Sequence, residues 1–209
     1  MKPIKANRIV QIVYPIFVYL IMYNILGNAF DLIFLNRQGH LMSLLLAGIL
    51  TIIPIAVIYK RVPGIVYTKE EHKHSFLINV LYIVFIVLVA VGLNVVLTRL
   101  TVSTGSSRLT DGSLVLKLLC NCLVIPILEE LLYRGVVLGQ LYVMYGARAA
   151  ILISAFCFGF FHFNLIQFLY AFIVGLVIGL AYVRTKHILV PIIGHGLANL
   201  VVVIYSVLT

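Results

Sequence analysis

The chain has 209 residues, of which 63% are hydrophobic, and its mean hydropathy is +1.18. This composition excludes a soluble globular domain, and the continuously apolar runs exclude a membrane β-barrel, whose strands alternate in polarity. The net charge of +9 does not indicate a nucleic-acid partner, because basic residues of membrane proteins gather in cytoplasmic loops, so we predict an all-α integral membrane protein in a lipid bilayer.

Long apolar runs predict about seven transmembrane helices, within a range of six to eight. In chain order the predicted spans are 9–26, 41–59, 76–98, 113–133, 147–163, 165–183 and 188–208. Charged or polar loops separate them at 60–74 and 99–112. The apolar stretch 136–145 is either a continuation of the fourth helix or a separate interfacial helix.

The division of the chain follows its polar residues. Residues 1–112 form three N-terminal helices with their loops and carry no diagnostic motif, whereas 113–209 form a C-terminal four-helix core within one membrane domain. With the N-terminus inside, eleven Lys and Arg residues lie on the cytoplasmic side and three on the other. This bias predicts a cytoplasmic N-terminus.

Three charged residues, Glu129, Glu130 and Arg134, interrupt the fourth apolar run. A charge at the centre of a membrane helix costs about 2.5–3.5 kcal/mol on insertion scales, so charges there indicate a functional site. Glu130 and Arg134 are four residues apart and can pair on one helix face, while Glu129 is rotated about 100° away. The alternative is a helix end whose charges lie at the membrane surface.

Two further polar clusters follow in the later spans. Phe158 and His162 are four residues apart, and so are His195 and Asn199. The glycine and alanine residues around His195 keep the surroundings small, as the wall of a cavity requires. A single His or Asn in a membrane helix is also a common hydrogen-bond partner for a neighbouring helix, which is the structural alternative for each cluster.

Together the clusters favour hydrolysis. One free Glu, two His and one Asn supply a general base, its helper and two donors for an oxyanion. No HExxH sequence is present, so the common zinc-protease helix is absent.

The motifs Glu129-Glu130-x-x-x-Arg134, Phe158-x-x-x-His162 and His195-x-x-x-Asn199 resemble those of a known family. They are similar, in order, to the three motifs of the CAAX prenyl protease type II and bacteriocin-processing family, called CPBP or Abi. The resemblance covers about half of the chain, from residue 114 onward.

The resemblance implies an intramembrane endopeptidase and a role for each motif residue. Glu129 and His162 would activate water, and His195 and Asn199 would stabilise the oxyanion. Residues that support the site would be Glu130, Arg134 and Phe158.

The resemblance leaves the metal question open, because the family has been described both as metalloproteases and as glutamate-type proteases. A zinc site needs three protein ligands plus water, and Glu129, His162 and His195 could supply them. We favour a mechanism without cofactor, because Asn199 beside His195 suits a pair of donors better than a pair of ligands.

The resemblance also implies a membrane-associated peptide or protein substrate, lipidated substrates included, and we expect a bacterial plasma membrane. A competing hypothesis is a non-catalytic immunity or scaffold protein with the same fold. A transporter is a third reading, although no inverted repeat is apparent.

The depth of Glu129 in the membrane is a critical test. If the fourth helix ended at Tyr133, Glu129 would lie near one face and His162 roughly 22 Å away along the next helix. We therefore favour one long helix from Ser113 to about Tyr145, with Glu129 near its middle.

Overall fold

The structure, a computed structural model, describes residues 6–34, 39–61, 76–100, 113–162 and 164–208, and these contain helices and no strand. Parts of the two predicted polar loops (62–75 and 101–112) lie outside the described residues. The helices are α1 (Ala6–Asp31), α2 (Gly39–Arg61), α3 (Phe76–Leu100), the segmented helix from Leu114 to Tyr145, α7 (Ala147–Phe160), α8 (Leu165–Thr185) and α9 (Leu189–Leu208).

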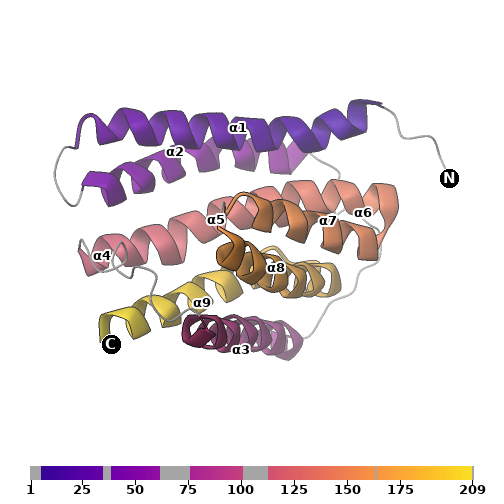
Figure 1. Cartoon of the computed structure of the whole chain (residues 1–209). Coiled ribbons are helices and arrows are strands. Elements are labelled where there is room, and N and C mark those ends of the chain that lie inside the picture. Colours follow the sequence, from indigo (N-terminus) through magenta and orange to yellow (C-terminus); the bar gives the residue numbers. More distant parts are fainter. Residues whose placement is uncertain (1–5, 35–38, 62–75, 101–112, 163, 209) are drawn as a thin grey trace.

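The segmented helix, which we call the central rod, runs without interruption from Leu114 to Tyr145 (Figure 1). Its parts are α4 (Leu114–Lys117), the π-helical η2 (Leu118–Val124), α5 (Ile125–Glu130), the π-helical η3 (Leu131–Leu138) and α6 (Gly139–Tyr145). Every junction residue keeps right-handed helical dihedral angles. The prediction of one long helix is therefore confirmed, and Glu129 lies at its middle.

Among the residues that the structure describes, four helices are long and apolar enough to cross a bilayer: Ile9–Asp31, Gly39–Arg61, Phe76–Leu97 and Leu165–Thr185. Two shorter apolar helices accompany them, Ala147–Phe160 and Leu189–Tyr205. Large apolar side chains such as Phe17 (57% exposed) and Leu88 (66% exposed) point away from the protein, as lipid contact requires. The predicted all-α integral membrane protein is confirmed.

The helices form layers around the central rod. Figure 1 shows α1 and α2 side by side above the rod, with α7 and α8 beside it and α3 and α9 below. One core cluster joins the rod to α2 and α7, including Ile55, Leu132 and Phe158. A second joins α3, α8 and α9, including Ile86, Ile178 and Val190. Burial on both sides of the rod places its charged residues inside the protein.

A tight hairpin sets the register between the rod and α7. Gly146 connects them with φ +80, a left-handed conformation that glycine adopts without strain. Glu129 precedes Tyr145, the last residue of the rod, by 16 residues, and His162 follows Ala147, the first residue of α7, by 15 residues. Because the two arms run antiparallel, equal arm lengths bring Glu129 and His162 to the same depth.

Small residues let α8 approach the rod and α7. A Cβ on Gly175 would lie 3.2 Å from Ala155 Cβ, and one on Gly179 would lie 3.3 Å from Leu138 Cδ1. The two glycines are four residues apart and share a helix face. This close approach brings the Gly175 carbonyl within reach of Arg134.

Candidate active site

The two adjacent carboxylates have different surroundings. The Glu130 side chain is fully buried, whereas that of Glu129 is 14% exposed and lines a cavity. The helical rotation of about 100° between neighbours accounts for the difference. Glu129 therefore faces space that a substrate can enter, and Glu130 faces protein.

Glu130 contacts Arg134 on one side and His195 on the other. Arg134 Nε lies 3.1 Å from Glu130 Oε2, so the ion pair predicted from the spacing is present. These two atoms are not aligned as a hydrogen bond, and we therefore describe the contact as electrostatic. His195 Nδ1 lies 2.8 Å from Glu130 Oε1, and since a carboxylate accepts, Nδ1 is the donor. Glu130 thus joins the rod to α9.

Phe158 lies at the centre of the site. Its ring meets the imidazoles of His162 and His195 edge to face, with centroids 5.2 and 5.9 Å away. The Arg134 guanidinium lies 4.5 Å from the centroid of the same ring, a cation–π contact, and Tyr133 packs against it at 5.3 Å. One aromatic ring thus restricts the orientation of both imidazoles and offsets part of the free-energy cost of burying the arginine charge.

His162 follows the end of α7, and a hydrogen bond orients its ring. Its Nδ1 lies 3.0 Å from the Phe158 carbonyl, which can only accept, so Nδ1 carries the proton. In the neutral ring the other nitrogen, Nε2, then holds a lone pair. His162 lines the same cavity as Glu129.

His195 and Asn199 are presented by one face of α9. His195 Nε2 lies 3.9 Å from Glu129 Oε2, while its Nδ1 is engaged by Glu130. Asn199 donates from Nδ2 to the main-chain carbonyl of Asn121 at 2.8 Å. An amide nitrogen carries two hydrogens, so one of them remains for another acceptor.

The cavity that these residues share has a volume of about 420 Å³. All four proposed catalytic residues line it, together with Phe158, whereas Glu130 and Arg134 lie behind its wall. The helix α3 contributes Asn94 and Leu97, so an N-terminal helix joins the four C-terminal ones. The remaining lining residues are Asn121, Ile125, Ile166, Gln167, Tyr170, Ala171, Val174, Ala198, Val202 and Val203.

The candidate ligands for a metal ion are Glu129, His162 and His195. A structural or catalytic zinc needs at least three protein ligands converging on one point. Within the described ranges, no group of three or more His, Cys, Asp or Glu side chains is arranged to hold an ion. No chemical step is therefore assigned to a metal here.

Several polar residues of the cavity were not predicted as site residues. Asn94, Gln167 and Tyr170 line it, and the Asn121 carbonyl holds the Asn199 amide. The available signal was an amide side chain within an apolar run, at Asn94 and Asn121, because such residues are costly in lipid. Assigning them to the cavity needed the packing of α3 and the π-helical register of the rod.

The comparisons with known proteins concern the same part of the chain. Residues 111–201 match the family model described as "Type II CAAX prenyl endopeptidase Rce1-like". "Putative membrane peptidase YdiL" of Bacillus subtilis (strain 168) is 38% identical over 89 residues, which cover 43% of this chain. The aligned region is 36% of that relative's length. No solved structure matches the chain. The matched region contains all three motifs, so residues 111–201 of the chain are similar in sequence to Rce1-like type II CAAX prenyl endopeptidases.

Proposed function

We propose that this protein is an intramembrane endopeptidase. The observation that carries the proposal is the convergence of Glu129, His162, His195 and Asn199 on one cavity, from three different helical elements. The family match over the same residues supports hydrolysis of a peptide bond.

In the proposed reaction Glu129 and His162 act on one water molecule. Glu129 takes a proton from the water, His162 Nε2 helps to orient it, and the water oxygen attacks the carbonyl carbon of the scissile bond. The electron pair of the carbonyl moves to its oxygen. When this tetrahedral intermediate collapses, the C–N bond breaks and the proton passes from Glu129 to the leaving amine.

His195 and Asn199 stabilise the negative oxygen of that intermediate. The remaining N–H of Asn199 Nδ2 and the N–H of His195 Nε2 are the donors. Because Nδ1 of His195 already donates to Glu130, donation from Nε2 requires a proton on each ring nitrogen. The Glu130 carboxylate balances the resulting positive charge, and Arg134 in turn balances Glu130.

The proposed substrate is a membrane-associated peptide or protein, with lipidated substrates included. The cavity wall is largely apolar, with side chains such as Ile125, Val174 and Val202 among a few amides. Such a wall suits a segment that enters from the lipid rather than from water. The prenyl peptide named in the family description is one member of this substrate class.

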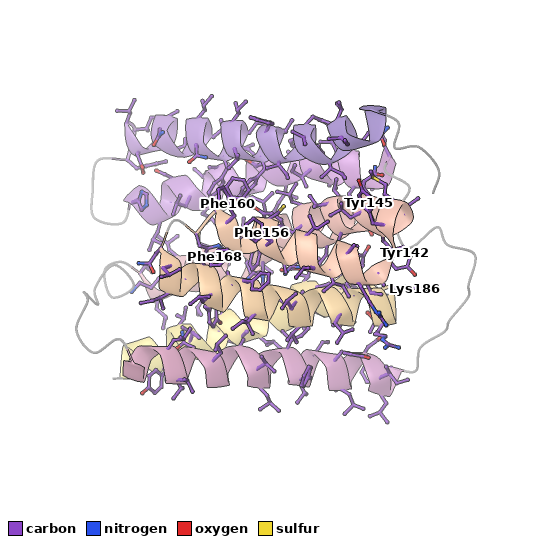
Figure 2. All side chains as sticks on the ribbon, turned by 45° about the vertical axis from the view of Figure 1, so that its right-hand side comes forward. Tyr142, Tyr145, Phe156, Phe160, Phe168 and Lys186 are labelled. Atoms are coloured by element: carbon purple, nitrogen blue, oxygen red, sulfur yellow. The ribbon has the colours of Figure 1, made fainter. Side chains whose placement is uncertain are left out.

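We also propose a bacterial plasma membrane and a cytoplasmic N-terminus. The start of α1, the end of α2 and the hairpin after α6 lie at one end of the bundle (Figure 1). Figure 2 shows Tyr142, Tyr145 and Lys186 at one end of the bundle as well. Tyrosine rings beside lysine are typical of a membrane interface, and basic residues favour its cytoplasmic side.

The proposal is tested with purified protein in liposomes and a library of membrane-anchored peptides, lipidated and unlipidated, read by mass spectrometry. We expect cleavage by the wild type and loss of at least 10³ in rate for Glu129→Gln and for His162→Ala. Asp31→Asn, at the far end of α1, is the matched carboxylate control and retains the rate. Cleavage at the wild-type rate by Glu129→Gln overturns the assignment.

The proposed reaction uses no metal, which is tested separately. Treatment with 1,10-phenanthroline, compared with a non-chelating isomer, is expected to leave the rate unchanged. Elemental analysis of the purified active protein is expected to find zinc well below one ion per chain. Stoichiometric zinc that is lost together with activity contradicts this part of the proposal.

A further inference from the structure

Pro126 lies inside the central rod, one turn before the two glutamates, and is buried. Proline has no main-chain N–H, so a helix that contains it leaves a carbonyl without its usual donor. In an apolar interior such a carbonyl needs another partner, because an unsatisfied polar group there costs free energy. The location of this carbonyl depends on the local helix type.

The freed carbonyl is that of Asn121. The preceding segment η2 is π-helical, and the Ile125 N–H accordingly bonds to the Cys120 carbonyl, five residues back. In the same register the donor for Asn121 would come from residue 126, which is the proline. The donor four residues on, Ile125, is already engaged. Asn121 therefore presents its carbonyl without a donor from its own helix.

Two residues on one face of α9, Gly196 and Asn199, lie against this part of the rod. Asn199 Nδ2 donates to the Asn121 carbonyl at 2.8 Å. A Cβ on Gly196 would lie only 2.5 Å from the carbonyl oxygen of Cys122, next to Asn121 in the rod. Gly196 thus permits the close approach, and Asn199 supplies the hydrogen bond.

We infer that Pro126 is a positioning residue for Asn199: its missing N–H reserves the Asn121 carbonyl for the Asn199 amide and thereby directs the second amide N–H into the cavity. The expected effect of Pro126 on catalysis rests on the proposed function. The hydrogen bond and its dependence on Pro126 are properties of the helix pair alone.

The test is a double-mutant cycle with Pro126→Ala and Asn199→Ala, because alanine at 126 restores an N–H that competes for the Asn121 carbonyl. Pro126→Ala is expected to lower kcat about tenfold, less than the 10²–10³ expected for full loss of an oxyanion donor, with KM unchanged within about twofold. In the Asn199→Ala background it is expected to change kcat by less than about twofold. Pro54→Ala, which removes a proline from the middle of α2, is the matched control and retains kcat.

The same four proteins are compared by thermal unfolding, which does not depend on activity. In the Asn199→Ala background the restored N–H satisfies a carbonyl that has lost its partner. The change in Tm caused by Pro126→Ala is therefore expected to be about 2–4 °C more positive in the Asn199→Ala background than in the wild type.

Two outcomes overturn the inference: an equal fall in kcat in both backgrounds, which indicates a packing role, or equal shifts of Tm in both. If no protein of the set cleaves any peptide while the Tm coupling is present, the proposed function fails and the positioning bond stands. Wild-type cleavage without coupling in Tm leaves the proposed function standing and overturns the inference.

Discussion

The polar side chains of α2 and those of the C-terminal helices satisfy their hydrogen bonds in different ways. In α2, Ser43 donates to the Gly39 carbonyl and Thr51 to the Ala47 carbonyl, both four residues back in the same helix. These bonds satisfy buried hydroxyl groups within one helix, and the polar link from α2 to α1 lies at its start, where His40 Nδ1 is 3.0 Å from Asp31 Oδ2. The two hydroxyl bonds would be the same in an isolated helix.

In the C-terminal half several bonds cross between helices, although Thr185 donates to the Ala181 carbonyl of its own helix. Ser154 of α7 donates to the Tyr133 carbonyl of the rod at 2.8 Å. Arg134 Nη2 reaches the Gly175 carbonyl of α8 at 3.4 Å, and His195 of α9 donates to Glu130. The difference indicates that the first half is held mainly by apolar packing, whereas the second half also relies on specific polar contacts that position a site.

The largest expected effect comes from removing one partner of the buried ion pair. Arg134→Ala leaves the Glu130 carboxylate with only His195, and breaking a buried pair costs about 3–5 kcal/mol. Unfolding in detergent, followed by circular dichroism, measures the free energy of unfolding. The double variant Glu130→Leu/Arg134→Met is the control, because removing both charges avoids an unpaired one. A double variant as unstable as Arg134→Ala contradicts the explanation by charge.

An intermediate effect is expected where the two halves meet. A Cβ on Gly135 would lie 2.6 Å from Tyr59 Cδ2 of α2, so Gly135→Ala must displace the tyrosine ring. Overpacking of this kind costs about 1–3 kcal/mol. Gly92→Ala, at a position with no heavy atom within 4 Å, is the matched control and is expected to change stability by less than about 1 kcal/mol. Equal melting temperatures for the two variants would show that the Tyr59 ring of α2 moves aside at little cost in stability.

The smallest expected effect tests the comparison of serines directly. Ser154→Ala removes a bond between helices and leaves the Tyr133 carbonyl without this donor, at a cost of about 0.5–1.5 kcal/mol. Ser43→Ala removes a bond within one helix whose acceptor already belongs to that helix, and the cost is expected to be below about 0.5 kcal/mol. Reversal of this order in thermal unfolding would remove the distinction between the two halves.

Much of the helical layout could be predicted because it depends on local features of the sequence. Apolar runs of about 20 residues predicted the helices, and the four-residue spacing of Glu130 and Arg134 predicted their ion pair. Phe158 and His162 are likewise four residues apart, and their rings are in contact. Each of these depends on a single helix, whose periodicity is known in advance.

The remaining features depend on packing between helices. The contribution of Asn94 to the cavity requires α3 to pack on α8 and α9, and nothing in its own apolar run indicates a partner. The bond from Asn199 to Asn121 depends on a π-helical register that a period of 3.6 residues does not predict. The catalytic roles of Glu129, His162, His195 and Asn199 stay predictions until variants are assayed.

The local ion pair in the rod also has a consequence for how the chain enters the membrane. Glu130 finds Arg134 within its own helix, so this part of the rod can enter the bilayer as a neutral pair before α9 has been synthesised. Glu129 gains its imidazole neighbours only from later parts of the chain, where His162 follows α7 and His195 of α9 lies 3.9 Å away. During biogenesis, an unpartnered Glu129 in an apolar environment raises the free energy of the rod. Packing of α9 against the rod lowers that free energy, so the contact that completes the site also favours the final step of assembly.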